Sequence, residues 1–229
     1  MENSRLSWRL ATLAAGWAAL TATAPAIAQT RDHAPVGLPG ANLMTQDKEG
    51  SESWTYVNPA TYFSKYRTVI VEPTTVYNGP DAQFDGIAPA DRTKFAAILT
   101  DALRSELGKS FPAPAKAQAD TLRVRVSLLG AKRTTGGVAT ATRVTPMGFG
   151  LSAAKSLMGK GGTLTGSVLF AVEVFDGQSG DLLLTAVRRR TPDPLDIPAT
   201  LSTADTVKAV ARDFAENARK KLENMTKQP

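Results

Sequence analysis

The chain has 229 residues, a formal net charge of +6, 42% hydrophobic residues and no cysteine. This length is enough for one domain with a single core, and the lack of cysteine excludes disulfide bonds, thiol nucleophiles and zinc-thiolate sites. The mild positive charge favours solubility, or weak contact with an anionic membrane surface through a nonspecific field.

Residues 1–28 have the pattern of a cleaved export signal. A short start with two arginines precedes an apolar run (10–24), and the segment ends with small residues at Ala26 and Ala28. The apolar run covers about 15 residues, short of the roughly 20 that cross a bilayer as a helix. We therefore expect a signal peptide that is cut between Ala28 and Gln29, and a periplasmic protein.

Residues 29–53 have no apolar period and are rich in Gly, Pro, Asp and Asn, which predicts a flexible leader. A single domain is expected over residues 54–229. Its first segment, 54–66, is rich in aromatic side chains and is expected to dock on the rest of the domain. The next run, 67–72, is β-branched and stops before Pro73, which predicts a strand.

Two amphipathic helices are predicted. In the first, 91–107, apolar residues recur at three- and four-residue spacing, with Asp91 and Gly108 placed to cap its two ends. The second follows Ser202, whose spacing from Asp205 resembles a capping box, and it carries basic residues in its last turns.

Three further strands lie between the two helices. The first, 122–128, alternates apolar and polar residues, which is typical of a strand with one buried face. A Gly-rich insertion at about 130–162 follows, with a short helix predicted over 147–158. Residues 164–176 and 182–190 then form a hairpin around a Gly-Gln-Ser-Gly turn.

The first hairpin strand, 164–176, has apolar side chains on both of its faces, so a second layer must cover each face. We expect either the aromatic segment 54–66 or a partner chain to cover the face that the helices leave open. The predicted fold is an α+β two-layer sandwich with about four mainly antiparallel strands and two main helices on one face.

The order of four short strings resembles a bacterial envelope family. These strings are the strand 67–73, Phe-Asp-Gly-Ile (84–87), Arg-Val-Thr-Pro (143–146) and Phe-Asp-Gly-Gln-Ser-Gly (175–180). The family is the domain of unknown function numbered 3313, largely secreted or lipoprotein-like, and the resemblance covers roughly 56–222. It implies an envelope location and transfers no catalytic residue. Lipoprotein relatives carry their lipid on a cysteine, so this chain is expected to lack that anchor.

No catalytic constellation is convincing. Ser152 and Lys155 match the S-x-x-K pattern of penicillin-binding proteins, but the S-D-N element is missing and no K-T-G strand follows at a suitable distance. His33, the single histidine, lies in the predicted leader, where nothing would orient it as a base or a metal ligand. We therefore expect no enzyme; a small periplasmic hydrolase is the alternative.

Metal and cofactor sites are not expected either. The segment 81–86 is similar to a calcium loop, yet Gln83 and Arg92 stand where an EF-hand needs acidic ligands. The Gly-Lys-Gly-Gly-Thr string at 159–163 has the composition of a phosphate loop with its residues in the wrong order. A turn and a hinge are the better interpretations of these two strings.

Several arginines lie on the predicted strands. If the strands pair as predicted, they gather into one basic patch, although a solvated edge that discourages aggregation is the favoured interpretation. The arginines concerned are Arg123, Arg125, Arg188, Arg189 and Arg190. Nucleic acid is not an expected partner, because no aromatic-basic recognition motif appears. Glu173 lies inside an apolar strand and is expected to pair with one of these arginines.

Together these features predict an exported, noncatalytic envelope protein that acts as a binding or assembly accessory domain. Its partner would be another envelope protein or envelope component of unknown identity. A second alternative is a peripheral lipid-binding protein that contacts the membrane through the apolar side chains of 147–158.

Overall fold

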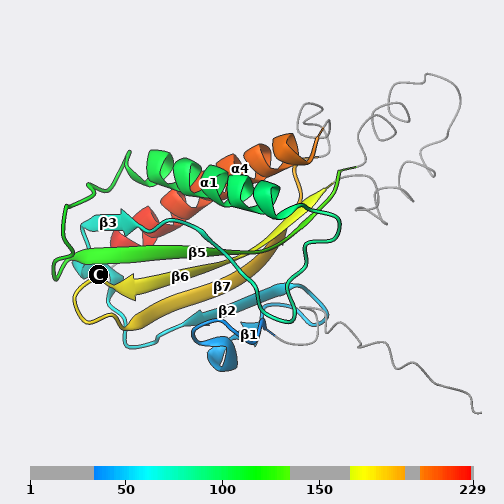
Figure 1. Cartoon of the computed structure of the whole chain (residues 1–229). Helices are drawn as coiled ribbons and strands as arrows, with labels where there is room; N and C mark the ends of the chain where they lie inside the picture. The colour runs from blue at the N-terminus through cyan, green and yellow to red at the C-terminus, as the bar shows by residue number, and fades with distance from the viewer. Residues whose placement is uncertain (1–33, 135–165, 194–201, 228–229) are drawn as a thin grey trace, which may run out of the picture.

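A computed structural model describes residues 34–134, 166–193 and 202–227 and arranges them in layers around one sheet (Figure 1). The strands are β1 (Thr45–Gln46), β2 (Ser53–Val57), β3 (Thr68–Val71), β4 (Thr75–Val76), β5 (Thr121–Lys132), β6 (Ser167–Asp176) and β7 (Leu182–Arg190). The helices are α1 (Pro89–Leu107) and α4 (Thr203–Lys227), with short 3-10 turns η1 (Ala41–Leu43) and η2 (Phe63–Lys65). Both long helices lie on the same face of the sheet (Figure 1).

The seven strands form one mixed sheet in the order β1-β2-β7-β6-β5-β3, with β4 also paired to β5. Neighbours from β1 to β5 along this order are antiparallel, whereas β3 and β4 run parallel to β5. The parallel pairs arise because α1 carries the chain back along the sheet between β4 and β5. The α+β class is confirmed, but the expectation of about four mainly antiparallel strands understates the sheet.

The four predicted strands are all present. The hairpin is β6 and β7, the alternating strand is β5, and the β-branched run is β3. The sequence did not predict β1, β2 or β4. Two of these are only two residues long, and β2 lies at the start of the aromatic segment, where it pairs along β7 as an added strand.

Helix α1 follows its predicted stripe, with Leu99 and Leu103 fully buried against the sheet. It begins at Pro89 rather than at Asp91, and its N-cap residue Ala88 makes no side-chain hydrogen bond. Proline suits the first helical position because its fixed φ is already helical and its missing N–H has no partner there anyway. Asp91 therefore lies in the first turn instead of capping the helix.

Helix α4 begins as predicted. The Asp205 backbone N–H donates to Ser202 Oγ at 3.1 Å, and that hydroxyl donates to Asp205 Oδ2 at 2.6 Å. This arrangement satisfies an N–H group that the first helical turn would otherwise leave without a partner. Farther along, the ring of Phe214 packs on Phe170 of β6 with centroids 4.4 Å apart, which fixes the helix over the sheet.

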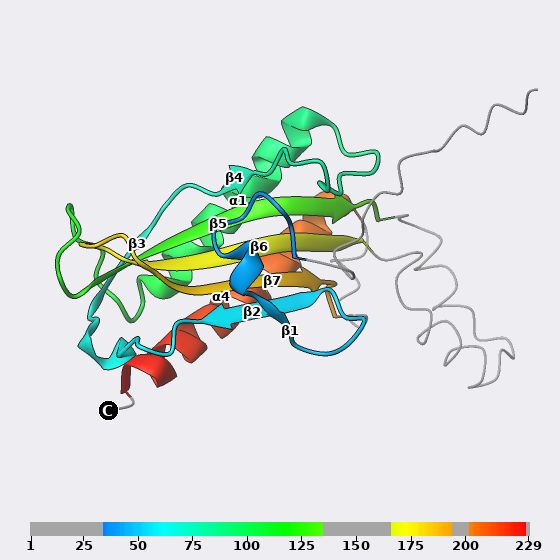
Figure 2. The ribbon, with the colours of Figure 1, turned by 90° about the horizontal axis from the view of Figure 1, so that it is seen from below.

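The opposite face of the sheet is covered by residues 34–44, which we call the strap (Figure 2). Leu38 and Met44 of the strap are buried on a second apolar cluster. The sheet residues of that cluster are Leu129, Leu169, Ala171 and Val187. The prediction of a flexible leader is therefore corrected for this stretch, and the cover belongs to the chain itself. Trp54 and Tyr56 of β2 pack only at its margin.

Hydrogen bonds tie the strap to the loop after β4. Asp81 accepts a hydrogen bond from the Val36 N–H at 3.2 Å and another from the Tyr77 hydroxyl at 2.6 Å. That hydroxyl in turn accepts from the Gly37 N–H at 3.2 Å. Asp81 thus has a structural partner for each carboxylate oxygen, and the segment that is similar to a calcium loop holds the strap in place.

The strap turns at Gly40, which has a φ of 71°. A Cβ at this position would lie 2.6 Å from Leu182 Cδ2 and 3.3 Å from Thr185 Cγ2. Both the backbone conformation and the close approach to β7 therefore favour glycine.

We expect Gly40→Ala to lower the free energy of unfolding by about 2 kcal/mol, because it adds left-handed strain and overlap with β7. Gly50→Ala is the matched control, since Gly50 has a φ of 69° and a Cβ added there would meet nothing within 4 Å. The control should lose about 1 kcal/mol from the conformation alone. Urea unfolding of both variants measures the difference, and equal losses would show that the strap does not press on β7.

Candidate functional site

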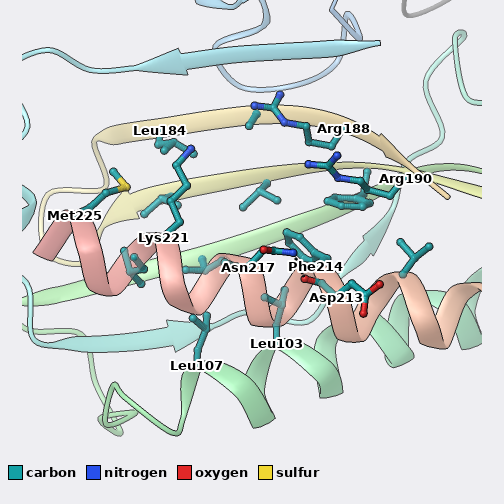
Figure 3. A pocket seen from close by; sticks show the side chains of 18 of the residues that line it. Leu103, Leu107, Leu184, Arg188, Arg190, Asp213, Phe214, Asn217, Lys221 and Met225 are labelled. Carbon is teal, nitrogen blue, oxygen red and sulfur yellow. Dashed lines mark hydrogen bonds between the residues drawn. The ribbon is translucent and has the colours of Figure 1, made fainter. Parts of the chain in front are cut away.

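An apolar groove lies on the helix face of the sheet, between α4 and the strands β6 and β7 (Figure 3). Its volume is about 630 Å³, within the usual range for sites that take small molecules. The sheet side is formed by Phe170, Val172, Val174, Leu184 and Ala186. The helix side is formed by Leu103, Leu107, Phe214, Ala218, Leu222 and Met225.

The groove exists because two helices are too narrow a layer for this sheet. Packed helices lie about 8–10 Å apart, whereas neighbouring strands are about 4.8 Å apart, so two helices cover roughly four strands. Helix α1 lies over the β5 and β3 side, and α4 packs along α1. The surface over β7 and β2 is therefore left without a helix, and Val57 at the end of β2 is 44% exposed.

The rim of the groove is mainly basic. Arg188 and Arg190 reach it from β7, and Lys221 points from α4 toward β7 (Figure 3). Arg188 is already held by Asp47 at 2.9 Å. Within the part of the chain that the structure describes, Arg190 and Lys221 form no ion pair. The groove thus combines an apolar floor with two cationic groups available to a ligand.

The five arginines of the predicted patch do not gather on one surface. Arg188 and Arg190 lie at the groove, but Arg189 alternates to the other face of β7, where Glu52 binds its guanidinium. Arg123 and Arg125 also lie on that other face and share Glu72. They pair in register with the far end of β6, so the strand directions separate them from the β7 arginines.

A second, polar cleft of about 470 Å³ lies on the strap face. It is lined by the strap at Gly37, Leu38 and Pro39 and by Glu72, Thr75, Val76, Tyr77, Asn78, Arg125, Ser127 and Glu173. Partial burial acts to raise the pKa of Glu72, but the hydrogen bonds from its two arginines outweigh burial and hold the pKa below its usual range. Glu72 is therefore a firmly ionised wall of this cleft.

Glu173 does not form the ion pair that its sequence position suggested. The residue is only 1% exposed, and its Oε1 has no hydrogen-bond partner among the described residues. Burial raises the pKa of this carboxyl to about 7; Arg125 acts to lower it and Glu72 to raise it further. Arg125 lies directly across from Glu173 in the strand register, but its guanidinium pairs with Glu72 instead.

Some sequence-predicted site residues lie outside the described parts of the chain. These are Ala26, Ala28, Gln29, His33, Ser152 and Lys155, together with the segment 147–158. In the described residues, no cluster of three or more His, Cys, Asp or Glu side chains could hold a metal ion. No helix there has the length and apolar character needed to cross a membrane.

Sequence reasoning missed the groove, although one signal for it was present. Along one face of β7 the residues run Leu184, Ala186, Arg188 and Arg190, so an apolar half gives way to a basic half. A face that is both apolar and basic fits neither a closed core nor a fully solvated surface, and it indicates an open apolar site.

A family model described as protein of unknown function (DUF3313) matches residues 37–218. The chain belongs to this family. The resemblance inferred from the four sequence strings is thereby confirmed, and the matched range of the DUF3313 domain starts within the strap. No curated protein matches the chain.

Several solved structures are similar to the DUF3313 chain at low sequence identity, and two of them serve as examples. The PelC dodecamer from Paraburkholderia phytofirmans is 16% identical, with 74% of this chain and 95% of that chain covered at a TM-score of 0.38. A DUF4136 family protein from Bacteroides thetaiotaomicron is 12% identical, with 76% and 96% covered at a TM-score of 0.34. At these values neither protein's assembly nor its role transfers to this chain.

We expect Glu173→Gln to change how stability depends on pH. The pKa of this acid is higher in the folded chain, about 7, than the ordinary 4.5. The folded state therefore holds the proton more tightly, and the wild type loses stability as pH rises between these values, by up to about 3 kcal/mol.

Urea unfolding at pH 5 and pH 8 measures this effect. Glu173→Gln should match the wild type at pH 5 and exceed it at pH 8. Glu72→Gln is the opposing control, because it removes the acceptor of Arg123 and Arg125 and should destabilise at pH 8. Identical pH profiles for Glu173→Gln and the wild type would contradict a buried, unpaired carboxyl.

Proposed function

We propose that this chain is an exported, noncatalytic binding domain of the bacterial envelope, and that its ligand occupies the groove between α4 and β7. The observation that carries the proposal is the pairing of an apolar floor with a basic rim in one opening of about 630 Å³. The export signal in residues 1–28 supports the location, and membership of the DUF3313 family is consistent with it.

The chemistry of the groove favours an acyl chain with an anionic head group. Each methylene that leaves water on the apolar floor contributes about 0.8 kcal/mol. Arg190 and Lys221 stand at the opening, where an anionic end of such a ligand would remain partly solvated. Asp213 also lines the rim, but Arg212 pairs with it at 3.3 Å, so the local field stays positive.

Binding of cis-parinaric acid, whose fluorescence rises in apolar surroundings, tests this function. We expect saturable binding to the wild type, and Lys221→Glu should weaken it about fivefold, the size of one exposed ion pair of roughly 1 kcal/mol. Lys220→Glu is the control for net charge, because it makes the same charge change one residue away, outside the groove. It also breaks the exposed ion pair between Lys220 and Glu216, so urea unfolding should first show that the variant is folded.

The methyl ester of the same probe separates the contribution of the apolar tail from that of the anionic head group. It keeps the apolar tail and lacks the anionic group, so its affinity should be indifferent to Lys221→Glu. Equal weakening by Lys221→Glu and Lys220→Glu would point to a nonspecific field, and absence of saturable binding would contradict a ligand site in the groove.

The location has its own test. Protein recovered from the periplasm of an expressing bacterium should begin at Gln29, because Ala26 and Ala28 present the small residues that signal peptidase reads. N-terminal sequencing measures the cleavage point. Ala28→Arg is the matched variant and should leave the uncleaved chain, whereas a native protein that retains Met1 would contradict a cleaved signal.

A further inference from the structure

The polar cleft on the strap face contains an acid to which the described residues give no hydrogen bond or ion pair. Glu173 lies on the floor of this cleft and is almost completely buried, yet Oε1 has no partner among the described residues. Leaving a buried acceptor without a partner costs about 1–3 kcal/mol, more if it is charged. An apolar residue would be more stable at such a position, so a ligand that supplies the missing partner would explain the acid.

The neighbours of Glu173 are engaged elsewhere. Arg125, its register partner on β5, donates to Glu72 Oε2 at 3.0 Å and lies 5.0 Å from the centroid of the Phe175 ring. Thr185, its register partner on β7, also has a buried hydroxyl without a partner among the described residues. Both side chains stand directly across from the carboxyl but neither forms a hydrogen bond with it, so Arg125 acts on Glu173 only through its charge.

The other charged side chains and the tyrosine around the cleft already have partners, so Glu173 is the group that remains for a ligand to bind. Glu72 comes from the connection after β3 and is bound by both arginines of β5. The strap contributes only Gly37, Leu38 and Pro39, which carry no charge. The Tyr77 hydroxyl is tied to Asp81. A cationic ligand would supply the direct partner that the ionised Glu173 lacks.

The surroundings select an organic cation over a metal ion. Calcium takes six to eight oxygen ligands, and the described residues hold no cluster of three or more suitable side chains. An ammonium group needs only a few acceptors for its three N–H donors. Besides Glu173, the polar residues Ser127 and Asn78 line the cleft, and the Ser127 hydroxyl also forms a hydrogen bond with the Thr75 hydroxyl at 3.1 Å.

We propose that the cleft beneath the strap binds a small ligand with a primary ammonium group, and that Glu173 is the carboxylate that receives it. Gly37, Leu38 and Pro39 of the strap and Arg125 of β5 line the cleft around Glu173. This site lies on the other face of the sheet from the groove of the proposed function, and the two are independent.

Calorimetry with 1,4-diaminobutane at pH 8 tests the proposal, with 1,4-butanediol as the neutral probe of equal length. The full chain should bind the diamine saturably and ignore the diol. Glu173→Gln should weaken diamine binding at least tenfold. Glu49→Gln removes an exposed acid outside the cleft and should leave binding unchanged, which controls for the net charge.

A titration of the wild-type protein tests the same site without a substitution, in case Glu173→Gln fails to fold. Carbon-13 NMR of the Glu173 carboxyl should show its pKa falling when the diamine is present, because the ammonium stabilises the ionised form. An unchanged titration, or equal binding by Glu173→Gln and the wild type, would overturn the site. Lys221→Glu should leave diamine binding intact, so failure of this site is distinguishable from failure of the groove.

Discussion

The central strand β6 is apolar on both of its faces, and the rest of the structure depends on covering both. On the helix side, Phe170 and Val174 require α1 and α4. On the other side, Leu169 and Ala171 are fully buried only because the strap lies over them. An apolar strand between two antiparallel neighbours would otherwise expose a large apolar surface, so the domain has three layers where a two-layer sandwich was predicted.

The two covers differ in how they are held. The helices attach through apolar contacts along their stripes, including the stacked rings of Phe214 and Phe170. The strap is short and adds polar contacts to the burial of Leu38 and Met44. Asp81 accepts hydrogen bonds from both the backbone of Val36 and the Tyr77 hydroxyl. Burial raises the pKa of Tyr77 to about 12, with the hydrogen bond to Asp81 acting in the same direction, so the hydroxyl remains a donor throughout the physiological range.

Local sequence patterns predicted more of the fold than of the candidate sites. The stripe of α1, the Ser202 cap and the β6–β7 hairpin were predictable because each depends on residues close together in sequence. The strap was not, since its Gly and Pro content is typical of a loop and its burial depends on strands that are distant in the sequence, at Leu129, Leu169, Ala171 and Val187. The arginine patch failed for a related reason: pairing depends on register and face, and Glu72, which binds two of the arginines, stood outside the prediction.

Both candidate sites lie where a face of the sheet is incompletely covered. Two helices leave the β7 side open, where the alternation along the strand places Arg188 and Arg190 beside an apolar floor. The strap reaches across β6 and β7 but leaves a polar cleft above Arg125 and Glu173. A sheet that satisfied only its own packing would place apolar residues at such points, as β6 does elsewhere. The charges therefore stand where the covers end, and the two proposed ligands, on opposite faces of the sheet, would carry opposite charges.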